Sequence, residues 1–123
     1  MAETNSITNF REFWPYYVAA HSRSMTRIIH LIATLSSWII IAFAVTTGYW
    51  WYLLSVPFVA YALAWYSHFF IEHNRPATFG HPFYSLAADY KMAALMLTGQ
   101  MSREIERLNQ SQTEQNYFAA NRQ

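Results

Sequence analysis

The chain has 123 residues, with 8 Lys and Arg, 7 Asp and Glu and a formal charge of +1, so no electrostatic attraction for nucleic acid is expected. It has no cysteine, which excludes disulfides, thiolate nucleophiles and zinc-thiolate sites. The charges are segregated, however, because none of the 44 residues from Ile28 to Ile71 is Asp, Glu, Lys or Arg. A membrane span needs about 20 apolar residues, so this gap has room for two spans and a turn. The sequence predicts an all-α integral membrane protein built on a two-span helical hairpin.

The N-terminal part predicts a short interfacial helix over residues 7–20, in which aromatic and polar side chains mix and which begins or is interrupted near Pro15. The N-terminus lacks the features of a signal peptide. Segment 22–27 carries hydroxyl side chains suited to capping a new helix and two arginines suited to lipid headgroups. The first span is expected over about 27–47.

Gly48 and Tyr49 mark the expected tip of the hairpin, because two threonines and a glycine break the apolar run before a group of aromatic residues. The second span is expected over about 50–71. Pro57 lies in its early turns, where proline is tolerated, and Pro76 follows its charged end.

Beyond a loop, residues 83–101 carry apolar side chains at helical spacing around Asp89 and Lys91. Two central charges argue against a third span and favour an amphipathic helix on the membrane or against the hairpin. Residues 102–123 are polar and predict a solvated helix that frays into disorder. The whole chain, 1–123, is expected to be a single domain.

The distribution of basic residues predicts the topology. Two spans return the chain to its starting side, and all 8 Lys and Arg lie outside the hairpin. The positive-inside rule therefore predicts a multi-pass protein with both termini in the cytoplasm. Membrane lipids are its expected surroundings, and nothing in the sequence supports a homodimer.

Four histidines form the candidate site. With the tip at Gly48, His30 lies 18 residues before it and His68 20 after it, so an antiparallel hairpin puts both at nearly one depth. His21 and His81 flank this pair, and the four predict a metal site at the foot of the hairpin. Imidazole ligands suit iron, zinc, copper and nickel alike.

Helical geometry adds two conditions to this site. His73 follows His68 by five residues, about 140° round a helix, and is expected to point away. His21 and His30 are nine residues apart, which would put them on opposite faces of one helix. A break between them is therefore required if both bind one ion.

Polar residues after the second span offer further roles. Glu72 shares a helical face with His68, so it could ligate or orient an imidazole, or it could instead pair with Arg75. Asn74 and Arg75 could bind the carboxylate of an acidic lipid substrate.

These motifs carry a family resemblance. Over roughly 9–99 the chain resembles short bacterial members of the Mpo1-like family, most specifically in the run His-Phe-Phe-x-Glu-x-Asn-Arg-Pro-Ala that starts at His68. The resemblance implies a non-haem Fe(II)-dependent dioxygenase that uses O2 to shorten a 2-hydroxy fatty acid by one carbon. It also implies a bacterial inner-membrane location, or the endoplasmic reticulum in a eukaryote, and catalytic, metal-binding roles for His21, His30, His68 and His81.

Two other classes of function remain open from the sequence. In a haem-binding membrane subunit, His30 and His68 would be axial ligands, and a Soret band would reveal it. In a non-catalytic membrane adaptor, the histidines would be structural and the C-terminal helix would bind another protein.

Overall fold

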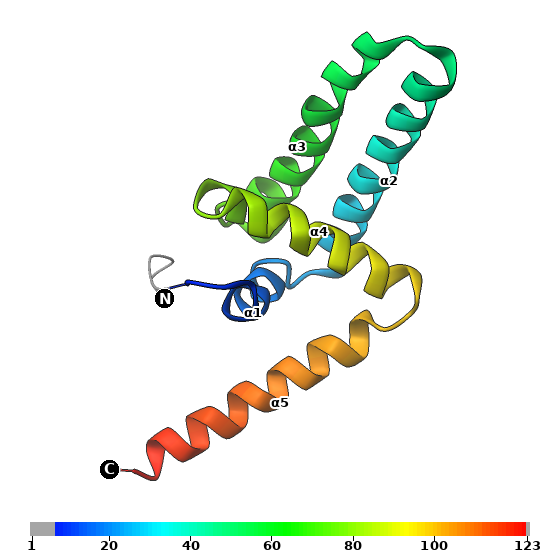
Figure 1. Ribbon diagram of the computed structural model, residues 1–123. Coiled ribbons are helices and arrows are strands. Elements are labelled where there is room, and N and C mark those ends of the chain that lie inside the picture. Colours follow the sequence, from blue (N-terminus) through cyan, green and yellow to red (C-terminus); the bar gives the residue numbers. More distant parts are fainter. Residues whose placement is uncertain (1–6, 123) are drawn as a thin grey trace.

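The computed structural model describes residues 7–122, and every regular element in that range is a helix. The all-α prediction is confirmed. In Figure 1, α2 and α3 stand side by side as an antiparallel hairpin, α4 crosses its foot, α1 lies near α4, and α5 extends away. The elements in chain order are α1 Phe10–Ala20, α2 Ser24–Thr47, η2 Trp50–Leu54, α3 Ser55–Ser67, η3 His68–Glu72, η4 Ala77–Phe79, α4 Pro82–Leu97 and α5 Met101–Ala120.

Two helical segments, Ser24–Thr47 and Trp50–Glu72, are long and apolar enough to cross a membrane. The turn between them lies where it was predicted, because α2 ends at Gly48, whose φ of 75° suits glycine and whose N–H donates to the Ala44 carbonyl. The second arm changes its winding along its length. It begins as the 3-10 turn η2, continues as α3, and ends as the π-helical turn η3.

The outer surface of the hairpin is strongly apolar. Ile39 on α2 is 70% exposed and Phe58 on α3 is 76% exposed. Apolar surface this extensive marks a region that another apolar phase or partner covers. It fits the predicted contact with lipid.

The buried core lies at the foot, where α1, α4 and the start of α5 meet. Phe13 and Tyr17 of α1 pack in one cluster with Ala88 and Met92 of α4. Helix α4 also packs against α2, which agrees with the predicted helix against the hairpin.

Helix α1 differs from the sequence prediction at its proline. It is N-capped by Asn9, whose side chain accepts from the Glu12 N–H, and it runs through Pro15 to Ala20. Neither an interruption nor a beginning occurs at Pro15. Burial of one face of α1 in the core outweighs the single backbone hydrogen bond that proline removes.

Two further expectations about helix ends are wrong. No hydroxyl caps α2, whose N-cap Arg23 has no side-chain capping bond. Helix α4 stops at Leu97 and not at residue 101, because Gly99 takes a φ of 71° and reverses the chain.

The tail also differs from its prediction. Helix α5 is continuous from Met101 to Ala120, so the expected disorder is absent from the described tail. Its docking is as sparse as predicted, since Ile105 and Leu108 are partly buried against the core and most of the helix is exposed.

Candidate metal centre

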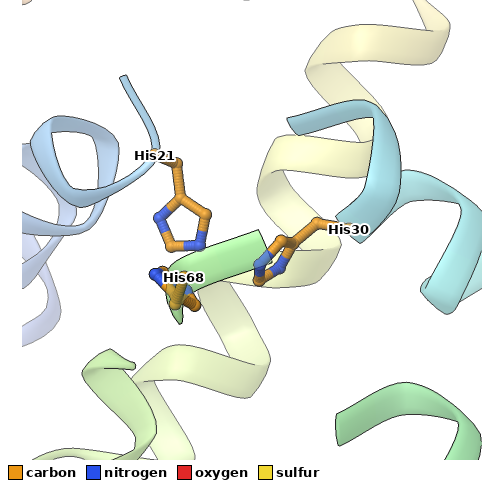
Figure 2. A group of neighbouring side chains, drawn as sticks. All are labelled: His21, His30 and His68. Atoms are coloured by element: carbon orange, nitrogen blue, oxygen red, sulfur yellow. The ribbon is translucent and has the colours of Figure 1, made fainter. Parts of the chain in front are cut away.

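Three of the four predicted histidines meet at the foot of the hairpin. His21 is the C-cap of α1, His30 lies in α2, and His68 is the first residue of η3. Their ring centroids are 4.4 Å (His21 to His30), 4.5 Å (His21 to His68) and 5.2 Å (His30 to His68) apart, and all three are buried. Figure 2 shows the rings turned toward one another. Each offers a nitrogen within 4.8 Å of the others, so the group could hold a metal ion.

The chain brings these rings together by two features that the sequence predicted. The antiparallel arms put His30 and His68 at one level. The helix break between Ala20 and Ser24 is real, so His21 does not have to share a helical face with His30.

Two of the imidazoles are oriented by acceptors on their Nδ1 atoms. His21 Nδ1 lies 2.7 Å from the Tyr17 carbonyl oxygen, and His68 Nδ1 lies 2.7 Å from Asn74 Oδ1. The Asn74 Nδ2 donates in turn to the Ala20 carbonyl at 2.9 Å, which fixes its oxygen toward His68. Because both partners accept, each Nδ1 carries the proton and each Nε2 keeps its lone pair for a ligand.

The third imidazole is held from α4. His30 Nδ1 lies 3.3 Å from Asp89 Oδ1, and Asp89 also accepts a hydrogen bond from the Tyr17 hydroxyl. The Tyr17 ring stacks on His21 with centroids 4.0 Å apart. Burial, and then the Asp89 charge, raise the pKa of Tyr17 well above its ordinary value, so it remains a donor at neutral pH. Asp89 therefore serves two residues of the centre at once.

The inward-facing nitrogens fit a bound cation. Within the described chain, Nε2 of His21 and Nε2 of His30 are buried without a hydrogen-bond partner. Burial first, and then the neighbouring His30 and His68, lower the pKa of His21 well below its ordinary value, which favours the neutral, ligating form. An unpaired buried acceptor costs about 1–3 kcal/mol, and a metal ion would remove that cost. Three neutral imidazoles are a suitable donor set for iron, zinc, copper or nickel.

His81 and His73 do not belong to this group of three. The His81 ring stacks on Tyr84 at 5.7 Å between centroids and lies edge-on to Phe13 at 5.5 Å. His73 is exposed and takes a left-handed φ of 56° after η3. This exposed position agrees with the expectation that His73 points away from His68.

Glu72 and Arg75 make their contacts with groups other than the ring nitrogens of the three histidines. The Glu72 carboxylate accepts from Ser22 Oγ at 2.8 Å and from the Arg23 N–H at 2.7 Å, so it occupies the start of α2 and stabilises the positive end of that helix. Arg75 is exposed, with its guanidinium carbon 5.5 Å from the Phe79 ring centroid. Of the three polar residues predicted after the span, Asn74 is the one that contacts a histidine of the group.

An apolar cavity of ≈ 220 Å³ opens from the histidines between α2, α3 and α4. Its wall extends along α2 from His30 to Ile41, about 16 Å at the helical rise. Small side chains, such as Ala33 on α2 and Ala60 and Ala64 on α3, leave this space between the arms. None of the described residues that line it is Lys or Arg. The wall of this cavity is therefore mainly apolar, with the three histidines and Asp89 among its polar members.

Tyr17 and Asp89 are site residues that sequence reasoning missed. The i to i+4 spacing of Tyr17 and His21 was a signal, because it puts their side chains on one helical face. Asp89 counts in the sequence as a charge against a third span, but an acidic residue in a mainly apolar helix also needs a buried partner or a role.

The fold and the site define an all-helical protein with an apolar hairpin and a buried three-histidine candidate metal centre. A family model described as "2-hydroxy-palmitic acid dioxygenase Mpo1-like" matches residues 7–101, and the protein belongs to this Mpo1-like family. The match includes all three clustered histidines, Asn74 and Asp89. Searches among curated proteins and among solved structures found no match.

Proposed function

We propose that the protein is an iron(II)-dependent dioxygenase that shortens a 2-hydroxy fatty acid by one carbon. The observation that carries the proposal is the position of three inward-facing, buried imidazoles beside a mainly apolar cavity between the arms. The name of the family supports the substrate class.

In this proposal the hairpin is inserted in a membrane with both termini in the cytoplasm. The exposed apolar surface of both arms would face lipid, and an acyl chain would enter the cavity between the helices from the bilayer. The complete absence of Lys and Arg between Arg27 and Arg75 supports this orientation.

The overall reaction balances without an external reductant. One 2-hydroxy acid and one O2 give the acid one carbon shorter, one CO2 and one water. The bond between the carboxyl carbon and C2 breaks, C2 becomes the new carboxyl group, and the four electrons lost by the substrate reduce O2. When bound, iron(II) would supply the redox chemistry for this transfer.

The residues of the chain have distinct parts in this scheme. His21, His30 and His68 would hold the ion, while Asn74 and Asp89 fix two of the rings through Nδ1. An ion held by three protein ligands would keep open positions for the 2-hydroxy acid. The apolar wall would hold the chain and exclude bulk water.

The haem alternative is disfavoured by the spacing of the rings. His30 and His68 have centroids 5.2 Å apart, and His21 contacts both. Axial ligands must stand on opposite sides of a porphyrin, and three rings in mutual contact leave no gap for its plane.

The direct test incubates detergent-purified, iron(II)-loaded protein with O2 and 2-hydroxypalmitate. We expect pentadecanoic acid and CO2 in equal amounts by mass spectrometry, and no product from palmitate, which lacks the hydroxyl, or from the His30→Ala protein. A Soret band, or stoichiometric iron without any shortened acid, would contradict the proposal.

A further inference from the structure

The Ser85 hydroxyl is a buried polar group that makes no hydrogen bond to the residues of the metal centre. Ser85 lies in α4, one turn before Asp89 and on the same face. Its side chain lines the cavity and is 4% exposed, yet its Oγ has no hydrogen-bond partner among the described residues. A buried hydroxyl without a partner costs about 1–3 kcal/mol, so it calls for a ligand.

Other helical hydroxyls of this protein show how that cost is normally avoided. Thr34 and Ser37, which also line the cavity, donate to the carbonyls of His30 and Ala33. Ser67, which is fully buried, donates to the Ala64 carbonyl in the same manner. Ser85 makes no such bond to the backbone of α4, so its hydroxyl is left without a partner among the described residues.

A second unpaired donor lines the cavity from another helix. The Trp65 Nε1 is buried without a partner, and Trp65 lies one turn before His68 on α3. Its ring packs edge-on against Phe79 with centroids 5.2 Å apart, which restricts its rotation. Two residues of the cavity wall thus each carry an unpaired neutral donor, and each lies one helical turn from a residue of the metal centre.

The charges of the residues that line the cavity indicate which ligand group the Ser85 and Trp65 donors would bind. A carboxylate accepts several hydrogen bonds, and in an apolar cavity it needs them together with a counter-charge. No Lys or Arg among the described lining residues can supply that charge, and Asp89 would repel the anion. A metal ion on the three histidines would supply the charge, and neutral donors would satisfy the remaining carboxylate lone pairs.

We propose that Ser85 Oγ and Trp65 Nε1 form the carboxylate subsite of the cavity and select long-chain acids over neutral lipids of the same length. This inference rests on the proposed function for the identity of the acid and for the bound cation. Ser85 and Trp65 would then contribute to binding of the acid and not to retention of the metal.

The test measures binding to the full-length protein loaded with zinc, which is redox-inert and suits three imidazoles. Displacement of a fluorescent fatty acid gives the affinity for 2-hydroxypalmitate and for hexadecane-1,2-diol, which keeps the chain and the 2-hydroxyl but lacks the carboxylate. We expect Ser85→Ala and Trp65→Phe each to weaken binding of the acid about tenfold, the effect of one hydrogen bond to a charged group, and to leave the diol unchanged. Ser85→Thr, which keeps the hydroxyl, should retain the affinity for the acid.

The matched control is Ser67→Ala, which removes a buried hydroxyl outside the cavity wall and should change neither affinity. Equal weakening for acid and diol, or loss of zinc from the Ser85→Ala protein, would overturn the subsite. So would unchanged affinity for the acid in both variants. If the wild-type iron protein still shortens 2-hydroxypalmitate, the proposed function survives that failure, whereas a wild-type protein without turnover contradicts the proposed function itself.

Discussion

The tip half and the foot half of this molecule are held together in opposite ways. Near the tip, hydroxyl side chains such as Thr46, Thr47 and Ser55 donate to carbonyls three or four residues earlier in the chain, and large apolar side chains face outward. At the foot, polar side chains join elements far apart in sequence, as in the pairs Trp14 with Glu104, Tyr17 with Asp89, Ser22 with Glu72, and Asn74 with Ala20.

This difference separates two sources of stability. The arms bury few side chains against each other, so their apolar surface is favourable only when another apolar phase or partner covers it. The foot buries its own aromatic core and directs its polar groups inward. The candidate chemistry lies in the half that the protein organises by itself.

The largest expected effect comes from removing a ring of the metal centre. Alanine at His21, His30 or His68 should lower metal affinity at least about 100-fold, since losing an outer hydrogen-bonding partner alone costs roughly 10–100-fold. Competition with a chromophoric chelator, followed by elemental analysis, measures the loss.

His81→Ala and His73→Ala are the matched controls and should keep the metal, because neither ring belongs to the group of three. Loss of metal from the His81→Ala protein to the extent seen at His30 would show that a fourth histidine ligates, as the family resemblance implied.

A charge placed on an arm should have the next largest effect. Ile39→Lys puts an ammonium on the exposed apolar face of α2, which costs about 2.5–3.5 kcal/mol near the centre of a membrane helix. A glycosylation-reporter assay in microsomes should show reduced insertion of the first span. Gln112→Lys, on the exposed face of α5, should insert as well as wild type, and equal behaviour of the two variants would contradict the membrane hairpin.

Removing an outer partner of the centre should have a smaller effect. Asn74→Ala deletes both the acceptor on His68 Nδ1 and the bond to Ala20, and should weaken metal binding roughly 10–100-fold. Asp89→Ala should act similarly through His30. Asp89→Asn keeps an acceptor oxygen and should retain more affinity than Asp89→Ala. Equal loss in the two variants would indicate that charge, and not orientation, is what Asp89 provides.

The smallest effect concerns the docking of α5 and its dependence on pH. Hydrogen bonds from Arg107 first, and then from Trp14, lower the pKa of Glu104 from 4.5 to about 2. A depressed folded-state pKa gives stability that is fully present above pH 4.5 and is lost as the pH falls toward 2. The indole N–H resonance of Trp14 in the folded protein should therefore stay constant as the pH falls through 4.5 and should move only as the pH approaches 2. In the Glu104→Gln protein this movement should be absent.

The sequence predicted the features that depend on spacing along one helix or across one turn. The uncharged stretch identified both arms, Gly48 identified the tip, and these together placed His30 beside His68. The required break after His21 followed from helical geometry alone. Such features have local causes, so residue types and separations are enough to find them.

Features that depend on packing between distant segments were not predictable in this way. The roles of Asp89 and Glu72 arise from α4 crossing the foot and from the second arm reaching the start of α2. The π-helical turn η3 has no sequence signal of its own, yet it lets the Asn74 N–H donate to the His68 carbonyl and brings the Asn74 side chain back to the ring. Charge counting likewise could not show that α5 stays helical.

The residues of the centre lie on α1, α2, η3 and α4, so they are synthesised one after another and not together. A ribosome delivers His21 and His30 before the turn exists, His68 only after most of the second arm, and Asp89 last. Until the second arm has folded back on the first, the nascent chain has His21 and His30 in place but not His68. The three histidines can therefore come together only when the hairpin is complete, so a chain stalled at its first helix carries no assembled cluster.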